Sequence, residues 1–481
     1  MKTTVRYLLF GLILLGVFGT AHRNPHAIGQ PANYFAIDTV AKDLIVPWAV
    51  VFLPDQTMLF SERAGRIRLF RHNRLVAKPA LTVSDVETTK KMGLLGVCIH
   101  PDFAKNQFVY IAYNYKANDT PLLKVVRYQF DSDTLRNPTV LIQDILANQN
   151  HTGCRLKFGP DRKLYVTTGD ADRPITAQNL KSLNGKILRL NDDGSIPTDN
   201  PFMANDSARH EIWSYGHRNP QGLAFQPDTG HLFSSEHGPS GGDEINQIER
   251  GKNYGWPRVH HRDTAAGVVS PVLEYSPSVG PSEALFYNAD AFPALKGNLL
   301  VASLRGESIL RLQLDGKKIV AQERLFQKQY GRIRALAVGP DGCIYFSTSQ
   351  HDPPEGTPKP GSDLILRLRP VPAGDQSRFF GPLTATSNLA NVAVVSGNSP
   401  ENLYQQLCAS CHGPDLKGTD RAKSLFDRKH GSTRTEISQI IKHGLVGRGM
   451  PAWEGAIQPT DIEKIADYIL AKTSPKPAPA R

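Results

Sequence analysis

Cysteine is scarce in this chain, with five residues among 481. Three of them, Cys98, Cys154 and Cys343, stand far apart in the sequence and are odd in number. Such a set does not make the disulfide framework of a small secreted domain. We therefore expect these three to be buried, reduced residues on strands.

Long apolar runs are also missing, apart from Leu8–Phe18 near the N-terminus. Basic residues precede this run and the small residues 19–21 follow it, an order typical of a secretory signal peptide at residues 1–21. We therefore expect an exported, periplasmic protein. The alternative is an uncleaved membrane anchor, for which the run is short.

Motifs for nucleotide and nucleic-acid binding are absent. No G-x-G-x-x-G follows an expected strand, which disfavours a nicotinamide-binding fold. The net charge is +11, from 56 basic and 45 acidic residues, but the basic residues are dispersed. Nucleic acid is therefore not an expected partner. The charge indicates a solvated basic surface, which could also favour an acidic redox partner or an anionic cofactor.

The most specific motif of the chain lies near the C-terminus, where Cys408, Cys411 and His412 form a C-x-x-C-H motif. Two thiols at this spacing can each form a thioether with haem, and the adjacent imidazole can bind the iron. The motif predicts a covalently attached c-type haem and an electron-transfer role. Export agrees with attachment of haem outside the cytoplasm.

Methionine is as scarce as cysteine, and Met450 is the only one after the haem motif. Its thioether is the expected sixth iron ligand, as Met/His ligation is found in cytochromes c. A buried gap-filling role for Met450 and iron ligation by His430 or His443 stay open.

Two apolar stripes at helical spacing flank these ligands. The first precedes the motif and the second follows Met450; their members are Leu403, Tyr404, Leu407, Ile462, Ile465, Ala466 and Ile469. Thr460 and Glu463 have the spacing of a capping box for the second helix. Residues 399–475 are therefore predicted to form an all-α domain that resembles mono-haem cytochromes c.

Residues 33–370 contain an internal sequence repeat, which consists of an apolar strand, a Pro-Asp turn, a second strand, a polar turn and a third strand. Examples are VVFLPDQTMLFSE, LKFGPDRKLYVTTGD and LAVGPDGCIYFSTS. Short strands repeated at this period are typical of radial blades. We predict an all-β six-bladed β-propeller whose last blade is closed by a strand at residues 34–39. Residues 371–398, rich in Pro, Gly, Ser, Asn and Ala, are predicted to be a linker to the haem domain.

Polar segments in the loops depart from the repeat, notably SYGHRNPQGLAF, EHGPSGGDEINQIERGKNYGWP and NQNHTGCRLKFGPDRKLYVTTGD. With these motifs the region resembles the soluble glucose/sorbosone (aldose sugar) dehydrogenases, six-bladed propellers that use pyrroloquinoline quinone (PQQ) and calcium. The haem domain resembles the cytochrome extension of some exported quinoprotein dehydrogenases.

The resemblance implies site residues. The catalytic base falls on His151, and Arg218 would polarise the quinone oxygen. The backbone carbonyls of Gly238 and Pro239 match calcium ligands. PQQ contacts are implied for Lys91, Asn150, Arg218, Asn219, His237, Asp243, Arg305, Arg332 and Arg334.

Structural roles for several of these residues stay open. Arg218 could brace the Pro220 turn, and the Gly-rich loop could carry merely solvated acids. Arg332 and Arg334, alternate residues of one expected strand, point the same way and would pair with PQQ carboxylates, although alternating arginines are also common on exposed strand faces.

Two positions depart from the family pattern, which has Gln at position 91 and Lys at position 305, where this chain has Lys91 and Arg305. Both changes keep affinity for an acidic cofactor plausible but put the substrate range and the cofactor contacts in doubt.

The expected function is oxidation of the C1 hydroxyl of an aldose to a lactone, with PQQ, calcium and haem c. Electrons would leave through the tethered haem to a soluble cytochrome or a respiratory oxidase. The alternative is a non-catalytic propeller that binds a glycan or protein and carries a haem relay. The joint presence of His151, Arg218 and the calcium loop favours the enzyme.

Overall fold

The computed structural model describes residues 34–239, 241–261, 263–351, 361–374, 377–381, 383, 399–419, 422–427, 433–445, 450, 453 and 459–473. The predicted signal peptide, most of the predicted linker and the alternative iron ligand His430 lie outside these ranges. Within them, no helix is long and apolar enough to span a membrane.

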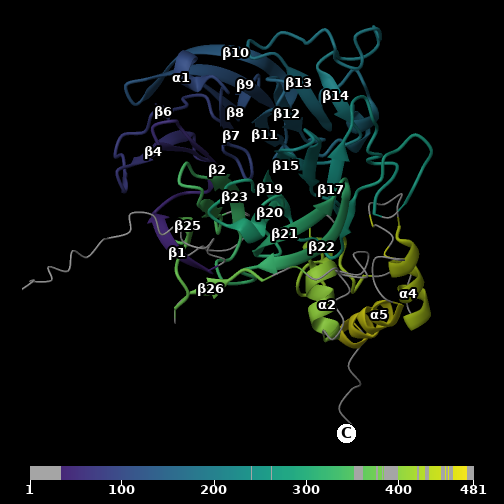
Figure 1. The fold of residues 1–481 in the computed structure, drawn as a ribbon. Helices are drawn as coiled ribbons and strands as arrows, with labels where there is room; N and C mark the ends of the chain where they lie inside the picture. The colour runs from purple at the N-terminus through teal and green to yellow at the C-terminus, as the bar shows by residue number, and fades with distance from the viewer. Residues whose placement is uncertain are drawn as a thin grey trace, which may run out of the picture.

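Six antiparallel sheets form the blades of a β-propeller, as predicted (Figure 1). The first three sheets contain β2 (Pro47–Phe52), β3 (Met58–Glu62), β4 (Arg66–Arg71), β5 (Arg74–Leu75) and β6 (Leu81–Thr82); β7 (Leu94–Ile99), β8 (Phe108–Ala117), β9 (Thr120–Asp131) and β10 (Thr134–Leu146); and β11 (Gly153–Phe158), β12 (Leu164–Thr168), β13 (Lys186–Leu190) and β14 (Ile212–Tyr215).

The other three sheets complete the ring. They contain β15 (Pro220–Phe225), β16 (Leu232–Glu236), β17 (Asp243–Ile248) and β18 (Leu273–Tyr275); β19 (Pro281–Phe286), β20 (Leu299–Ser303), β21 (Ser308–Asp315) and β22 (Lys318–Leu325); and β23 (Ile333–Val338), β24 (Ile344–Thr348), β25 (Ile365–Pro370), β1 (Tyr34–Ala41) and β26 (Arg378–Phe379). Three short helices lie in the connections: α1 (Phe103–Asn106), η1 (Pro174–Gln178) and η2 (Pro293–Leu295).

The repeated Pro-Asp turn has a chemical basis that is clearest between β11 and β12. Asp161 accepts hydrogen bonds from the backbone N of Lys163 (3.2 Å) and from the Tyr165 hydroxyl (2.9 Å). Asp341 accepts in the same way from Cys343 and Tyr345 before β24. A short acceptor that bonds the backbone two residues on is what makes Asp a turn residue, so each repeat closes one hairpin.

The N-terminal strand closes the ring, as the sequence predicts. β1 pairs antiparallel with β25, and the Asp38 carboxylate accepts from Arg367 (3.0 Å) and Arg369 (2.7 Å). β26 then adds to β1 through Tyr34. Part of the segment predicted as linker is therefore a strand, and Phe380, the residue after it, packs in the apolar core of the last blade.

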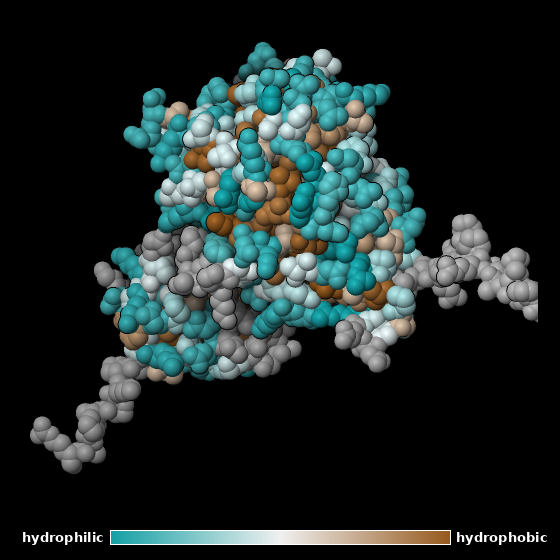
Figure 2. All heavy atoms as spheres, turned by 90° about the vertical axis from the view of Figure 1, so that its left-hand side faces the viewer, coloured by the Kyte–Doolittle hydropathy of each residue, from teal (hydrophilic) through white to brown (hydrophobic). Residues whose placement is uncertain are grey.

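The core is made of the apolar faces of neighbouring blades. The inner strands β2, β7, β11, β15, β19 and β23 each contact the next around the ring. Cys98, Cys154 and Cys343 are buried free cysteines, as expected. Burial raises the pKa of the Cys154 and Cys343 thiols to about 12, so they stay protonated. On the face drawn in Figure 2, apolar residues are concentrated in a central band within a mostly hydrophilic surface.

The haem domain contains α2 (Pro400–Leu407), α3 (Ala409–His412), α4 (Arg434–His443) and α5 (Pro459–Thr473), grouped beside the propeller in Figure 1. All seven residues of the two predicted stripes are buried in one core. The capping box lies elsewhere than expected: Thr433 and Glu436 form one on α4, whereas α5 starts at Pro459, which puts Thr460 inside its first turn.

Candidate functional site

The candidate residues of the propeller gather where its inner strands begin. His151 precedes β11, Arg218 and Asn219 precede β15, Arg332 precedes β23, and Lys91 lies in the turn before β7. Because the inner strands are neighbours in the ring, residues far apart in sequence share one rim. Loops at such a rim are the usual place for ligands on a rigid scaffold.

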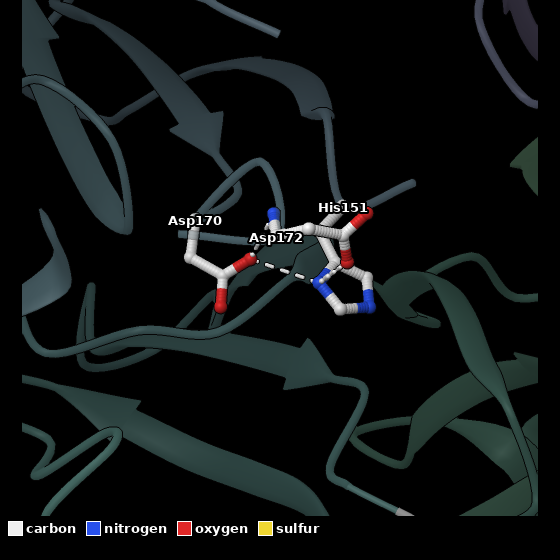
Figure 3. Close-up of side chains that lie close together, drawn as sticks. All are labelled: His151, Asp170 and Asp172. Carbon is white, nitrogen blue, oxygen red and sulfur yellow. Dashed lines mark hydrogen bonds and ion pairs between the residues drawn. The ribbon is translucent and has the colours of Figure 1, made fainter. Parts of the chain in front are cut away.

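His151 is held by carboxylates from the loop after β12 (Figure 3). Its Nδ1 lies 2.8 Å from Asp170 Oδ1 and 3.1 Å from Asp172 Oδ1. Asp170 is fully buried, whereas Asp172 is partly exposed. The His151 backbone has φ of +52°, a region that non-glycine residues rarely adopt and that is often found at functional sites.

The surroundings keep His151 neutral. Burial and the positive charge of Arg218 lower the pKa of its imidazole, and the bond to Asp170 offsets only part of that shift. With Nδ1–H donating to Asp170, the lone pair is on Nε2. An imidazole in this tautomer can accept a proton at Nε2.

The same three side chains could also hold a cation, because their ligand atoms lie within 4.8 Å of one another. That arrangement would need an unprotonated Nδ1 on His151. Two carboxylate oxygens on the Nδ1 side favour a proton there instead. We therefore interpret the cluster as an oriented base.

Asp170 joins His151 to the opposite wall of the site. Its second oxygen accepts from the Trp256 indole Nε1 at 2.8 Å, and the Arg218 guanidinium lies 5.3 Å from the centre of the Trp256 ring. Arg218 donates from Nη1 to the His237 carbonyl (3.2 Å). The base and the guanidinium are therefore fixed by a shared set of contacts.

The sequence motifs did not single out Asp170 or Trp256. Asp170 follows Gly169 at the end of one quoted motif, and Trp256 lies in the run NYGW near the end of another. Their roles depend on contacts between blades, which the repeat pattern does not contain.

Buried positive charge fits an anionic cofactor. Arg334 is 5% exposed, and burial together with Arg332, Arg155 and Arg63 lowers its pKa well below the usual value. Arg155 is neutralised by Glu283 at 2.5 Å. Among the described residues, the buried Nε of Arg218 has no hydrogen-bond partner. Guanidinium groups gathered in this way are suited to a ligand with several carboxylates, as PQQ has.

Arg332 and Arg334 were expected to be alternate residues of one strand, and the structure differs from this by one residue. Arg334 is the second residue of β23, but Arg332 lies just before the strand. The charge of Arg332 still acts on Arg334, which indicates that the two lie near one another. Their pairing with PQQ carboxylates stays a prediction.

The Gly-rich loop between β16 and β17 is compact and rich in oxygen. The backbone N of Gly238 donates to Asp243 Oδ1 (2.9 Å), whose other oxygen accepts from Ser278 (2.7 Å) and Gly280 (2.7 Å). Carbonyl and carboxylate oxygens are the ligands that calcium prefers, so the loop with Gly238 and Pro239 fits that ion. Asp243 also ties the loop to the next blade, a role the sequence did not predict.

The other predicted contacts lie around this rim. His237 donates from Nε2 to the Pro281 carbonyl (2.7 Å), and Asn219 Oδ1 accepts from the backbone N of Gly153 (3.2 Å). Asn150 donates to Asp172 (3.2 Å). Lys91 is half-buried and Arg305 is exposed. For all five, contact with PQQ stays a prediction.

The haem ligands share one small core. Cys408 and Met450 both pack against the cluster that α2, α4 and α5 form. His412 donates from Nδ1 to the Lys423 carbonyl (3.4 Å), which leaves Nε2 for iron. His443 is exposed, and its Nε2 lies 2.8 Å from Gln439 Oε1. The side chain of Cys411 lies outside the described part.

The backbone at Gly169 packs closely against the backbone of His151, the candidate base. An added Cβ there would overlap the carbonyl oxygen of His151, which is backbone and cannot move aside easily. We expect Gly169→Ala to lower the free energy of unfolding by about 2 kcal/mol, as overpacking does. Urea unfolding of the cofactor-free protein measures it, with Gly374→Ala as the control, since nothing lies within 4 Å of a Cβ at that position. Equal stability of the two variants would contradict the close contact.

Residues 44–354 match the family described as Glucose / Sorbosone dehydrogenase, and residues 396–469 match the family described as Cytochrome C oxidase, cbb3-type, subunit III.

Two relatives and one solved structure extend these matches. Aldose sugar dehydrogenase YliI of Escherichia coli is 35% identical over 333 residues, which are 65% of this chain and 90% of that protein. Quinoprotein glucose dehydrogenase B of Acinetobacter calcoaceticus is 36% identical over 279 residues, 52% of this chain and 58% of that protein. The PQQ-bound aldose sugar dehydrogenase of Streptomyces coelicolor superposes with a TM-score of 0.62 at 32% identity, over 71% of this chain and 99% of that one.

Proposed function

Because this chain belongs to the glucose and sorbosone dehydrogenase family, we propose that it is an exported enzyme that oxidises the C1 hydroxyl of an aldose to a lactone with PQQ and calcium. It is an oxidoreductase of the PQQ-dependent sugar dehydrogenase type, fused to a cytochrome c domain. The proposal adds export to the periplasm, calcium, and electron flow through the tethered haem to a soluble cytochrome or a respiratory oxidase.

The observation that carries the proposal is the neutral His151 imidazole, oriented by a buried carboxylate beside an arginine. Its Nε2 can take the proton of a substrate hydroxyl, while Asp170 stabilises the imidazolium that forms. Arg218 would stabilise negative charge that develops on a neighbouring oxygen. When bound, PQQ supplies the two-electron oxidant for the C1–H bond.

The chain's own groups would also bind the cofactor. Arg218, Arg332 and Arg334 would face its carboxylates, and the carbonyls of Gly238 and Pro239 would face calcium. The fusion of the two domains has a benefit of its own for electron transfer. Tethering gives the haem domain a high effective concentration at the propeller.

Sugar-driven haem reduction tests the proposal. The haem-containing protein is loaded with PQQ and calcium and given a panel of aldoses under anaerobic conditions while the haem absorption bands are followed. We expect at least one aldose to reduce the haem, only when both PQQ and calcium are present. Confirmed PQQ binding without haem reduction or dye reduction by any aldose would overturn the proposed substrate class, and no PQQ binding at all would favour a binding propeller.

Asp170 gives a second test, because it acts on substrate only through His151. In Asp170→Asn the carboxylate that raises the His151 pKa is lost, so that pKa falls further. The acid limb of kcat/KM should therefore move to lower pH, and kcat should fall about 10²-fold because Nδ1 loses its orienting acceptor. Steady-state kinetics with a dye acceptor over a pH series measure both effects.

Asp172→Asn is the matched comparison. Asp172 also raises the His151 pKa but is more exposed. We expect a smaller shift in the same direction. An unmoved acid limb in Asp170→Asn would show that Asp170 only supports the fold.

A further inference from the structure

Trp453 connects the haem domain to the propeller. On the haem-domain side it is 3% exposed, belongs to the core, and donates from its backbone N to the Ile441 (3.0 Å) and Lys442 (3.1 Å) carbonyls at the end of α4. Its ring also reaches across to the other domain. It is therefore held firmly by one domain while it contacts the second.

On the propeller side the ring meets Gly241 and His261. A Cβ placed on Gly241 would lie 3.4 Å from Cζ3 and 3.5 Å from Cη2 of Trp453, and the His261 ring centre lies 6.1 Å from that of Trp453 at an interplanar angle of 45°. Gly241 has φ of +126°, which favours glycine, so no side chain separates the indole from this backbone. The imidazole of His261 is itself packed on Gly242, where an added Cβ would lie 2.6 Å from Nδ1.

The backbone beneath Trp453 leads directly into the candidate site. Gly238 packs so closely on Gly241 and Gly242 that an added Cβ would overlap their carbonyl oxygens. The preceding carbonyl, of His237, accepts from Arg218. Trp453 thus touches the same short loop that the proposed function assigns to calcium.

The other end of the contact leads to the haem. Trp453 follows the expected iron ligand Met450 by three residues, and both pack in the core that also includes Cys408. The tryptophan therefore lies between the ligand segment of one redox centre and the loop of the other. Electron-transfer rates fall steeply with the distance between centres. A contact that holds the two domains together at this place therefore affects the rate of electron transfer to the haem.

We propose that Trp453 docks the haem domain on Gly241 and His261, and that this contact sets the rate at which the propeller reduces the haem. The inference rests on the proposed function. Oxidation of one aldose to its lactone releases two electrons and two protons. The ferric haem takes one electron at a time, an added one-electron acceptor such as ferricyanide or a cytochrome reoxidises it between transfers, and the protons pass to solvent.

The test compares two routes out of the same loaded holoprotein. Sugar-driven haem reduction is followed anaerobically by stopped flow, and sugar oxidation is followed separately with a phenazine dye that takes electrons from the propeller. We expect Trp453→Ala to slow haem reduction at least 10-fold and to leave dye reduction unchanged, and Trp453→Phe to recover part of the rate. Trp213→Phe, on the outer strand β14, is the matched control and should match the parent protein.

A variant on the propeller side guards against simple unfolding of the haem domain. His261→Ala removes one face of the docking contact and leaves the haem core intact, so it should slow haem reduction with an unchanged haem spectrum. A readout independent of turnover is small-angle scattering of the protein without PQQ, in which Trp453→Ala should have the larger radius of gyration.

The outcomes separate the two proposals. Haem reduction at the parent rate in both Trp453→Ala and His261→Ala, or an unchanged radius of gyration, would overturn the docking role. If the parent protein reduces neither dye nor haem with any aldose, the proposed function fails first, and the electron route fails with it.

Discussion

His151→Ala should lower kcat for aldose oxidation by about 10³-fold, within the range that a general base contributes. The reason is the loss of the Nε2 atom to which we assign the hydroxyl proton, on a neutral imidazole whose Nδ1 is bonded to Asp170. Affinity for PQQ should stay near that of the parent protein, because the guanidinium groups are untouched. Dye-linked kinetics measure kcat, and titration of the apoprotein with PQQ measures affinity.

Backbone strain is controlled by two further variants. His151→Asn removes the base but tolerates the φ of +52° well, so it should match His151→Ala. His72→Ala changes an exposed histidine whose φ is +49°, and it should leave kcat unchanged. Substantial activity in both His151 variants would remove this residue from the mechanism.

Arg334→Met should weaken PQQ binding and change the stability of the cofactor-free protein little. Loss of one charge-assisted contact of about 1.5–3 kcal/mol corresponds to roughly 10- to 100-fold in affinity. The free energy of unfolding of the apoprotein should change by less than about 1 kcal/mol, because the loss of the buried bond from Arg334 Nη1 to Gln221 Oε1 (3.2 Å) offsets the relief of repulsion from the other arginines. PQQ titration and urea unfolding give the two numbers.

Arg189→Met is the matched control for this pair of effects. Arg189 is buried like Arg334, and it forms ion pairs with Asp161 (2.9 Å) and Asp199 (2.8 Å). Its loss removes both ion pairs and the bond to the buried Asn200 side chain (2.9 Å), so it should destabilise the protein by about 2 kcal/mol, with PQQ affinity unchanged. Destabilisation of the apoprotein by both substitutions would show that Arg334 is a structural residue.

The architecture could be predicted largely from the sequence because each blade carries its own signal. The Pro-Asp turns repeat a local chemistry, and the strand at Tyr34 was expected to close the last blade, as β1 does. The helical stripes of the haem domain were predicted for the same reason, since periodicity reports burial directly. The strand β26 was not, because its pairing depends on an apolar surface built by other segments.

The site was predictable only where a motif carried it. His151 and Arg218 came from family motifs, and the structure brings them close enough for the charge of one to lower the pKa of the other. Asp170, Trp256 and Trp453 were missed because each acts across a boundary, between blades or between domains. Sequence periodicity describes the interior of a repeat, whereas these contacts join one repeat or domain to another.

The closing strand also has a consequence for the order of assembly during synthesis. Asp38 is made early, and its partner Arg367 follows 329 residues later. The ring must therefore stay open until nearly the whole propeller has emerged, and pairing across such a separation is slow. Because His151, Arg218 and Arg334 come from different blades, the rim they share is completed only when the circle shuts. The complete rim is thus a property of the finished fold and not of any single blade.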